Sequence, residues 1–132
     1  MIHFWFLLLL GCSNEPDVII LSVDTLRYDH VSVFNSESPS LTPEIDALAA
    51  DSVRFTQAYS PISVTGPAFI SMMTGLNIQN HNVAMNSFRG GPSLSVKHVT
   101  LAENFLAQGY RTAAFVSGFT LHPLLGLYQG FE

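Results

Sequence analysis

The stretch DVIILSVD, residues 17–24, decides the fold that this sequence predicts. It is a short apolar run, rich in β-branched residues, that begins directly after Pro16 and stops at Asp24. A run of this kind is typical of a strand that is buried on both faces of a sheet. A carboxylate at its end stands where parallel α/β folds place ligand sites. We therefore expect a buried first strand that presents Asp24 to a functional site.

Two further apolar runs predict strands, VRFTQAYS at residues 53–60 and YRTAAFVS at residues 110–117. Three helices are expected. The first precedes residue 53; it is opened by Thr42 and Pro43 and ends near Asp51. The second runs from Pro67 to the terminator Gly75, and the third from the capping box of Thr100 and Glu103 to Gly109. We expect residues 77–97 and the C-terminal tail to lack regular structure.

Strands that alternate with helices predict an α/β sandwich with a mainly parallel central sheet. A parallel sheet has to be covered on both faces, and three strands make a thin sheet for three short helices to cover. The sequence therefore predicts the N-terminal portion of a larger α/β domain, in which residues 17–132 are one part.

Composition places the chain among globular proteins and excludes some partners. It has 132 residues, of which 48% are hydrophobic and 11% charged, so disorder is disfavoured. The formal net charge is −5 and no basic stripe is visible, which argues against nucleic-acid binding. We expect a small-molecule substrate instead.

The N-terminus predicts a bacterial lipoprotein signal. The apolar run MIHFWFLLLLG is too short to span a bilayer as a mature helix, and it ends at Cys12, the only cysteine in the chain. LLGC resembles the lipobox at which bacteria lipidate the cysteine after cleavage. Residues 1–12 are therefore expected to be the signal and residues 13–16 a tether, with Cys12 anchoring the protein to the membrane of the cell envelope. A buried N-terminal strand or helix is the plainer alternative.

Asp24 and Thr65 are the two residues from which we expect chemistry. Thr65 stands at a strand-to-helix junction, where free backbone N–H groups and the helix dipole favour an oxyanion. Pro67 has no N–H, so Gly66 and Ala68 are the neighbouring donors. Each residue also has a plainer interpretation, since Asp24 could form an Asx turn or a helix cap and Thr65 a simple N-cap.

Together, Asp24 and Thr65 suggest metal-assisted nucleophilic catalysis. A divalent cation held by the carboxylate would lower the pKa of the hydroxyl group and turn a weak nucleophile into an alkoxide. The pair supplies only two ligands, whereas zinc takes about four and a hard cation about six. The sequence therefore predicts a partial metal site.

The histidines carry less information. His30, His81, His98 and His122 lie at no metal-ligand spacing, and an isolated histidine is more often a surface or turn residue. We expect His81 to be the one nearest a substrate pocket, because it follows the helix that Thr65 precedes. Arg27 and Asp29 are expected to pair in the loop after the first strand.

At these residues the chain resembles the N-terminal part of the sulfatase family, within the alkaline phosphatase superfamily. The matching blocks are PDVIILSVDTLRYDH, TPEIDALAADSVRFTQAYSP, VTGPAFISMMTGL and TLAENFLAQGYRTAAFVSG, in family order. The resemblance implies that Asp24 binds a divalent metal (Ca, Mg, Mn or Zn) and that Thr65 is the nucleophile. If the protein is an enzyme, we expect the Gly66 N–H to help to hold the oxyanion.

The sequence departs from the family pattern in ways that bear on the reaction. Thr65 occupies the place of the Cys or Ser that sulfatases convert to formylglycine, and threonine cannot be so converted. Relatives with threonine there resemble phosphodiesterases, phosphonate hydrolases and phosphoethanolamine transferases. Thr25 replaces the second aspartate of the usual pair, Phe69 replaces an arginine, and the family's Lys and His after the GYRT stretch are absent.

Two kinds of function follow from the resemblance. The first is a metal-dependent hydrolase of sulfate, phosphate or phosphonate esters, or a related transferase. The second is a surface lipoprotein that keeps the fold without catalysis. Because family members are several-fold longer and carry their other metal ligands far downstream, we expect the 132-residue chain alone to be inactive.

Overall fold

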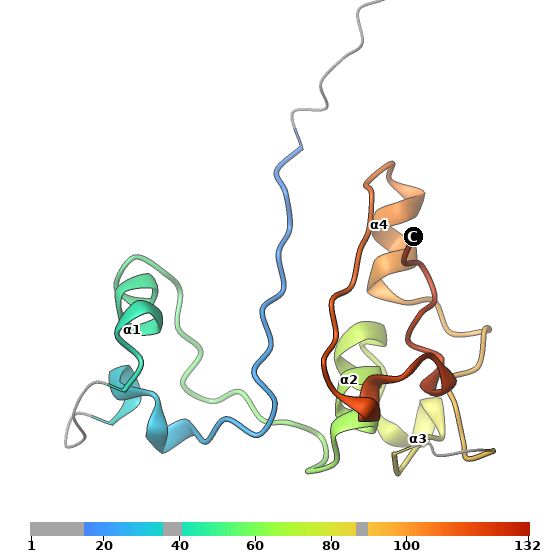
Figure 1. Cartoon of the computed structure of the whole chain (residues 1–132), viewed down its shortest axis with the longest axis horizontal. Coiled ribbons are helices and arrows are strands. Elements are labelled where there is room, and N and C mark those ends of the chain that lie inside the picture. Colours follow the sequence, from blue (N-terminus) through green and yellow to red (C-terminus); the bar gives the residue numbers. More distant parts are fainter. Residues whose placement is uncertain (1–14, 36–40, 87–89) are drawn as a thin grey trace, which may run out of the picture.

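The computed structural model describes residues 15–35, 41–86 and 90–132 of the chain, and the regular structure in these ranges is helical. Figure 1 shows α1 on one side of the molecule and α2, α3 and α4 together on the other. The α-helices are α1 (Pro43–Ala50), α2 (Thr65–Thr74), α3 (Ile78–His81) and α4 (Leu101–Ala107). The 3₁₀ helices are η1 (Tyr28–His30), η2 (Ser32–Phe34), η3 (Phe119–Leu121) and η4 (Pro123–Leu125).

Helix α1 begins with Pro43 as predicted, but Thr42 does not cap it through its side chain. The Thr42 hydroxyl instead accepts a hydrogen bond from the Ser32 amide at 3.2 Å and donates to Asp46 at 3.3 Å. Asp46 also accepts from the Val33 amide at 2.9 Å. These bonds tie α1 to η2 and place both in one small unit.

Helix α2 begins two residues earlier than predicted, with Val64 as N-cap and Thr65 as its first residue. Pro67 is tolerated there because the first four N–H groups of a helix have no partner within it. Gly75 ends the helix in the left-handed conformation, with φ of +68°, which confirms the predicted terminator. Within the stretch predicted as a loop, Asn77 opens the short helix α3 and Asn82 ends it, also at positive φ.

The capping box that opens α4 is confirmed. The Thr100 hydroxyl accepts from the Glu103 amide at 3.1 Å, and the Glu103 carboxylate accepts from the Thr100 amide at 2.8 Å. The fully buried Thr100 hydroxyl also donates to the Gln129 carbonyl at 2.9 Å, which ties the C-terminal segment to the start of α4.

The core lies between α2, the loops that follow it, and η4. Ile70, Val83, Leu94 and Leu125 are buried together, and Leu121 and Leu127 pack against them. Burying a side chain such as Ile70 or Leu125 contributes about 1.5–3 kcal/mol. This cluster holds α2 in place and therefore fixes the position of Thr65.

The predicted strands are the main error. The described residues contain no strand, and the segments 17–24 and 110–117 run extended without pairing into a ladder. A strand is stabilised by backbone hydrogen bonds to a neighbour and by burial of its side chains. Here Ile19 is 87% exposed, Phe55 77% and Phe115 98%. The predicted parallel sheet is therefore absent from the described part of the chain.

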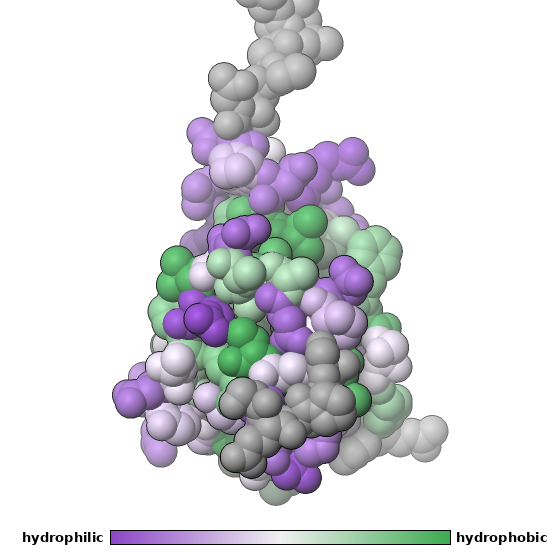
Figure 2. All heavy atoms as spheres, turned by 90° about the vertical axis from the view of Figure 1, so that its left-hand side faces the viewer, coloured by the Kyte–Doolittle hydropathy of each residue, from purple (hydrophilic) through white to green (hydrophobic). Residues whose placement is uncertain are grey.

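Apolar side chains consequently reach the surface. Figure 2 looks at the side that carries α1 and shows apolar surface interspersed with polar side chains. No helix in the described ranges is long and apolar enough to cross a membrane. The predicted signal of residues 1–12, its lipidation site Cys12 and the first half of the tether at residues 13–16 lie outside the described residues.

Candidate active site

Asp24 and Thr65 lie in direct contact. Asp24 ends the extended segment 17–24, and Thr65 is the first residue of α2, so two separate elements supply the pair. The Thr65 hydroxyl oxygen is 3.2 Å and 3.4 Å from the two carboxylate oxygens of Asp24 and donates a hydrogen bond to them. The two residues are 41 positions apart in the sequence. The tertiary structure therefore brings together the acid and the alcohol that the sequence singled out.

The backbone donors beside Thr65 are already engaged. The Gly66 N–H donates to the Asn86 side-chain oxygen at 2.8 Å, and the Ala68 N–H donates to the Val64 carbonyl at 3.1 Å. An anionic oxygen could use the Gly66 N–H only after the Asn86 side chain had moved away. The oxyanion role predicted for Gly66 therefore depends on a movement of Asn86.

Gly66 is also the residue that lets α2 pack closely. A Cβ atom at this position would lie 2.9 Å from the Asn86 side-chain oxygen and 3.0 Å from a methyl group of Leu125. Asn86 lies in a stretch predicted to be irregular, where asparagine is a common turn residue and predicts no particular role. No pattern in the sequence signals the bond that joins Asn86 to Gly66.

The pair fits a hard divalent cation in donor type but not in number. A carboxylate and a hydroxyl group are the oxygen ligands that such ions prefer. Within the described ranges there is no group of three or more His, Cys, Asp or Glu side chains that could hold a metal ion. Asp24 and Thr65 alone therefore supply too few ligands for a metal ion, and further ligands would be needed to complete a site.

The loop after Asp24 contains the predicted ion pair. The Arg27 guanidinium donates to both carboxylate oxygens of Asp29, with N–O distances of 3.0 Å and 2.5 Å. The Arg27 hydrogen bond, with a smaller contribution from His30, lowers the pKa of Asp29 to about 2. The pair is exposed, so we infer that it shapes the loop rather than adding much stability.

His81 has a packing role between α2 and α3. Its side chain is 3% exposed. One ring nitrogen, Nδ1, accepts from the Val83 amide at 3.1 Å, and Nε2 lies 3.0 Å from the Ser71 hydroxyl on α2. The Val83 bond requires an unprotonated Nδ1, so the Nε2–H of a neutral ring donates to Ser71. Both nitrogens are occupied, and a substrate could bind His81 only by displacing one of these partners.

Acidification should therefore weaken the fold through His81. Burial, with a contribution from His98, lowers the pKa of His81 below its ordinary value of 6.5. As the pH falls below 6.5, His81 of the unfolded chain takes up a proton before His81 of the folded protein does. The free energy of unfolding therefore falls between pH 6.5 and the lower pKa of the folded state. Above pH 6.5 this histidine does not change the stability.

The test is thermal unfolding at about pH 7.5 and about pH 5.5, on either side of the ordinary histidine pKa. We expect the melting temperature of the wild type to fall more than that of His81→Gln, which starts lower but has no imidazole to protonate. Equal falls in the two proteins would show that His81 does not carry the effect.

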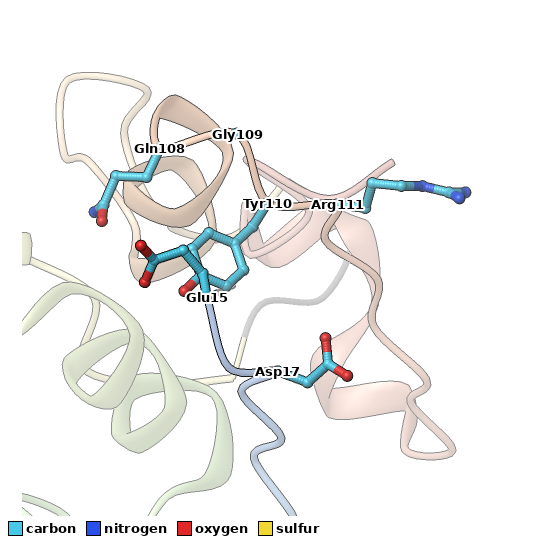
Figure 3. A pocket seen from close by; sticks show the side chains of 6 residues that line it. All are labelled: Glu15, Asp17, Gln108, Gly109, Tyr110 and Arg111. Atoms are coloured by element: carbon cyan, nitrogen blue, oxygen red, sulfur yellow. The ribbon is translucent and has the colours of Figure 1, made fainter. Parts of the chain in front are cut away.

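A separate hollow of about 330 Å³ is lined by Glu15, Asp17 and residues 108–111. Figure 3 shows the Arg111 side chain pointing away from the other side chains there. The hollow lies at the start of the extended segment that ends at Asp24, and seven extended residues span about 20 Å. It is therefore distinct from the Asp24–Thr65 pair.

Comparison with known proteins places the chain in a family. The sequence profile described as Sulfatase matches residues 16–123. The chain is 36% identical over 107 residues to arylsulfatase A of Bos taurus, a match that covers 78% of this chain and 20% of that protein. It is 28% identical over 101 residues to N-acetylgalactosamine-6-O-sulfatase of Bacteroides thetaiotaomicron, covering 76% of this chain and 20% of that protein.

The chain thus spans about a fifth of the length of these relatives. No solved structure gives a significant match to it. The family profile implies an alkaline-phosphatase-like α/β fold. Since that profile covers most of the sequence, including both Asp24 and Thr65, this chain belongs to the sulfatase family.

Proposed function

We propose that the whole protein is a metal-dependent hydrolase of sulfate, phosphate or phosphonate esters, in which Thr65 is the nucleophile. The contact of 3.2 Å between the Thr65 hydroxyl and the Asp24 carboxylate carries this proposal. It places a potential nucleophile beside a negatively charged group at the start of a ten-residue helix. Two residues 41 positions apart would not be held together in this way by local structure alone.

The reaction can be written with the residues of this chain. The Thr65 oxygen attacks the sulfur or phosphorus atom, the bond to the ester oxygen breaks, and the departing alkoxide takes up a proton from solvent. The Thr65 hydroxyl hydrogen already points to Asp24, which is placed to receive it. Water then attacks the sulfur or phosphorus atom, the bond to the Thr65 oxygen breaks, and that oxygen takes back the proton held by Asp24.

A divalent cation fits this site as a cofactor, in keeping with its use by sulfatases. Asp24 and Thr65 would be two of its ligands, and the ion would stabilise negative charge on the oxygens of the reacting group. The described part of the chain supplies too few ligands for a complete site, so the remaining ligands would have to come from other parts of the protein.

The chemistry of position 65 and the identity of the relatives favour different substrate classes. Formylglycine forms from cysteine or serine, and a threonine cannot supply the aldehyde whose hydrate attacks sulfate. A threonine oxygen can attack phosphorus directly, which favours phosphate or phosphonate esters, or transfer of phosphoethanolamine. The relatives named above are sulfatases, which favours sulfate esters.

Direct assays distinguish these substrates. The purified whole protein is tested with p-nitrophenyl sulfate, bis-p-nitrophenyl phosphate and p-nitrophenyl phenylphosphonate, with added Mg²⁺, Mn²⁺, Ca²⁺ or Zn²⁺ and with a chelator. We expect turnover of the phosphorus esters that the chelator abolishes. Turnover of the sulfate ester alone would assign the enzyme to sulfate chemistry. Absence of turnover with every ester and ion would favour the second candidate, a surface lipoprotein without catalysis.

That second candidate rests on specific side chains. Phe69 stands one turn after Thr65, where the family pattern has an arginine, and Thr25 stands in place of an aspartate. Both changes remove charge that would bind an anion or a cation. They do not remove the hydroxyl group or the Asp24 carboxylate, so the hydrolase is the function that the geometry supports best.

We propose further that the protein is anchored to the bacterial envelope through Cys12. Support comes from the lipobox-like sequence LLGC alone. Expressed in a bacterium and labelled with radioactive palmitate, the wild type should carry the label and sediment with membranes. Cys12→Ser should carry no label and leave the membrane fraction, while a conservative change at the preceding residue, Gly11→Ala, should keep the label. Equal labelling of the wild type and Cys12→Ser would contradict the anchor.

A further inference from the structure

The residue directly after Asp24 has an unusual backbone conformation. Thr25 has a φ of +57°, and Asn82 is the other non-glycine residue with positive φ in the described ranges. Asparagine tolerates this left-handed region, whereas a β-branched side chain such as threonine is disfavoured there. Thr25 is exposed, so burial of its own side chain does not hold it in this conformation.

The contacts on both sides of Thr25 account for its strained conformation. Upstream, Asp24 is bound to the Thr65 hydroxyl on α2. Downstream, the Arg27–Asp29 ion pair and η1 fix the start of the loop. Figure 1 shows the chain running along segment 17–24, bending, and leaving toward η1 on the side away from α2. The bend at Thr25 thus lets Asp24 remain at α2 while the chain turns away.

We propose that Thr25 is a positioning residue whose left-handed backbone holds the Asp24 carboxylate against Thr65. A strained conformation that persists next to a candidate site is evidence for a functional constraint. The inference rests on the proposed function for the meaning of the Asp24–Thr65 pair, but it concerns only the backbone at Thr25. Its content is that the conformation of Thr25, and not its hydroxyl group, is required.

Three substitutions separate backbone from side chain. Thr25→Gly removes the hydroxyl group and permits positive φ without strain. Thr25→Pro removes the hydroxyl group and locks φ near −65°. Thr25→Ile keeps a β-branched side chain, with more bulk and no hydroxyl group, and so disfavours positive φ without forbidding it. Should Thr25→Pro fail to fold, which circular dichroism would reveal, the comparison of Thr25→Ile with Thr25→Gly still tests the inference.

The measurements are the dissociation constant of Mn²⁺ for the whole protein and the crystal structures of the variants. Thr25→Gly should bind Mn²⁺ as the wild type does and keep the Asp24–Thr65 contact. Thr25→Pro should bind on the order of tenfold to a hundredfold more weakly, because loss of a group that orients a metal ligand typically lowers metal affinity by this factor. Thr25→Ile should lie between them, with a melting temperature close to that of the wild type.

The outcomes separate this inference from the proposed function. Equal loss of Mn²⁺ affinity in Thr25→Gly and Thr25→Pro would make the hydroxyl group the important feature and overturn the inference. Retention of wild-type affinity by Thr25→Pro, or by Thr25→Ile where the proline variant does not fold, would also overturn it. A wild type that binds none of Mn²⁺, Mg²⁺, Ca²⁺ and Zn²⁺ would contradict the proposed function. The crystal structures would then decide the positioning role by whether the Asp24–Thr65 contact is lost in Thr25→Pro or, failing that, in Thr25→Ile.

Discussion

Thr65→Ala should abolish ester hydrolysis by the whole protein while leaving it folded. Removing a nucleophile typically lowers kcat by about 10³-fold or more, since no other group takes over the covalent step. The hydroxyl group makes its contact with an exposed carboxylate, so its removal should cost about 1 kcal/mol of folding free energy or less. Steady-state kinetics and thermal unfolding of the same preparations measure the two effects.

Thr65→Ser is the matched control, because it keeps an oxygen at the position and removes only a methyl group. It should retain much more activity than Thr65→Ala, and trapping with a phosphorus ester should label the serine or threonine at position 65. Turnover by Thr65→Ala at the wild-type rate would remove Thr65 from the nucleophile role and leave Asp24 without its proposed partner in catalysis.

Gly130→Ala should be among the most destabilising substitutions in the C-terminal segment. Gly130 has a φ of +84°, and a Cβ atom there would press against the backbone of Glu103 and lie 2.7 Å from the carbonyl carbon of Ala102, both in α4. The left-handed conformation costs an alanine about 1–2 kcal/mol, and a contact with rigid backbone adds about 1–3 kcal/mol. We expect a loss of about 3 kcal/mol, measured by urea unfolding of the whole protein.

Gly109→Ala controls for the backbone conformation alone. Gly109 has a φ of +87°, close to that of Gly130, but a Cβ atom there would meet nothing within 4 Å. This variant should lose only about 1–2 kcal/mol. Equal losses in the two variants would show that the contact of the added Cβ atom with the α4 backbone does not contribute to the loss.

Two helix ends were predictable because they depend on local chemistry. The capping box at Thr100 and the terminator Gly75 use side chains and backbone within a few residues of each other. The start of α2 was placed two residues too late, because a proline usually marks the first helical position but is tolerated anywhere in the first turn. Helix α3 was missed because its four residues give no apolar periodicity.

The strands were not predictable in the same way. The apolar runs at residues 17–24, 53–60 and 110–117 have strand composition, but a strand exists only where neighbouring backbone supplies hydrogen bonds. In the described residues these runs remain unpaired, and their apolar side chains stay exposed. The composition of a segment indicates its preference for the strand conformation, whereas its pairing into a sheet depends on residues elsewhere in the protein.

The sequence by itself determined the family, the capping box at Thr100, the terminator Gly75, and the choice of Asp24 and Thr65 as candidate residues for a hydrolase. Each of these is encoded in residue types at short spacing or in blocks of fixed order. Only the tertiary structure decided that the Thr65 hydroxyl lies 3.2 Å from Asp24, that the Asn86 side chain accepts a hydrogen bond from the Gly66 N–H, and that His81 is buried. These are contacts between distant parts of the chain, and the packing around Ile70 and Leu125 that creates them has no local signature.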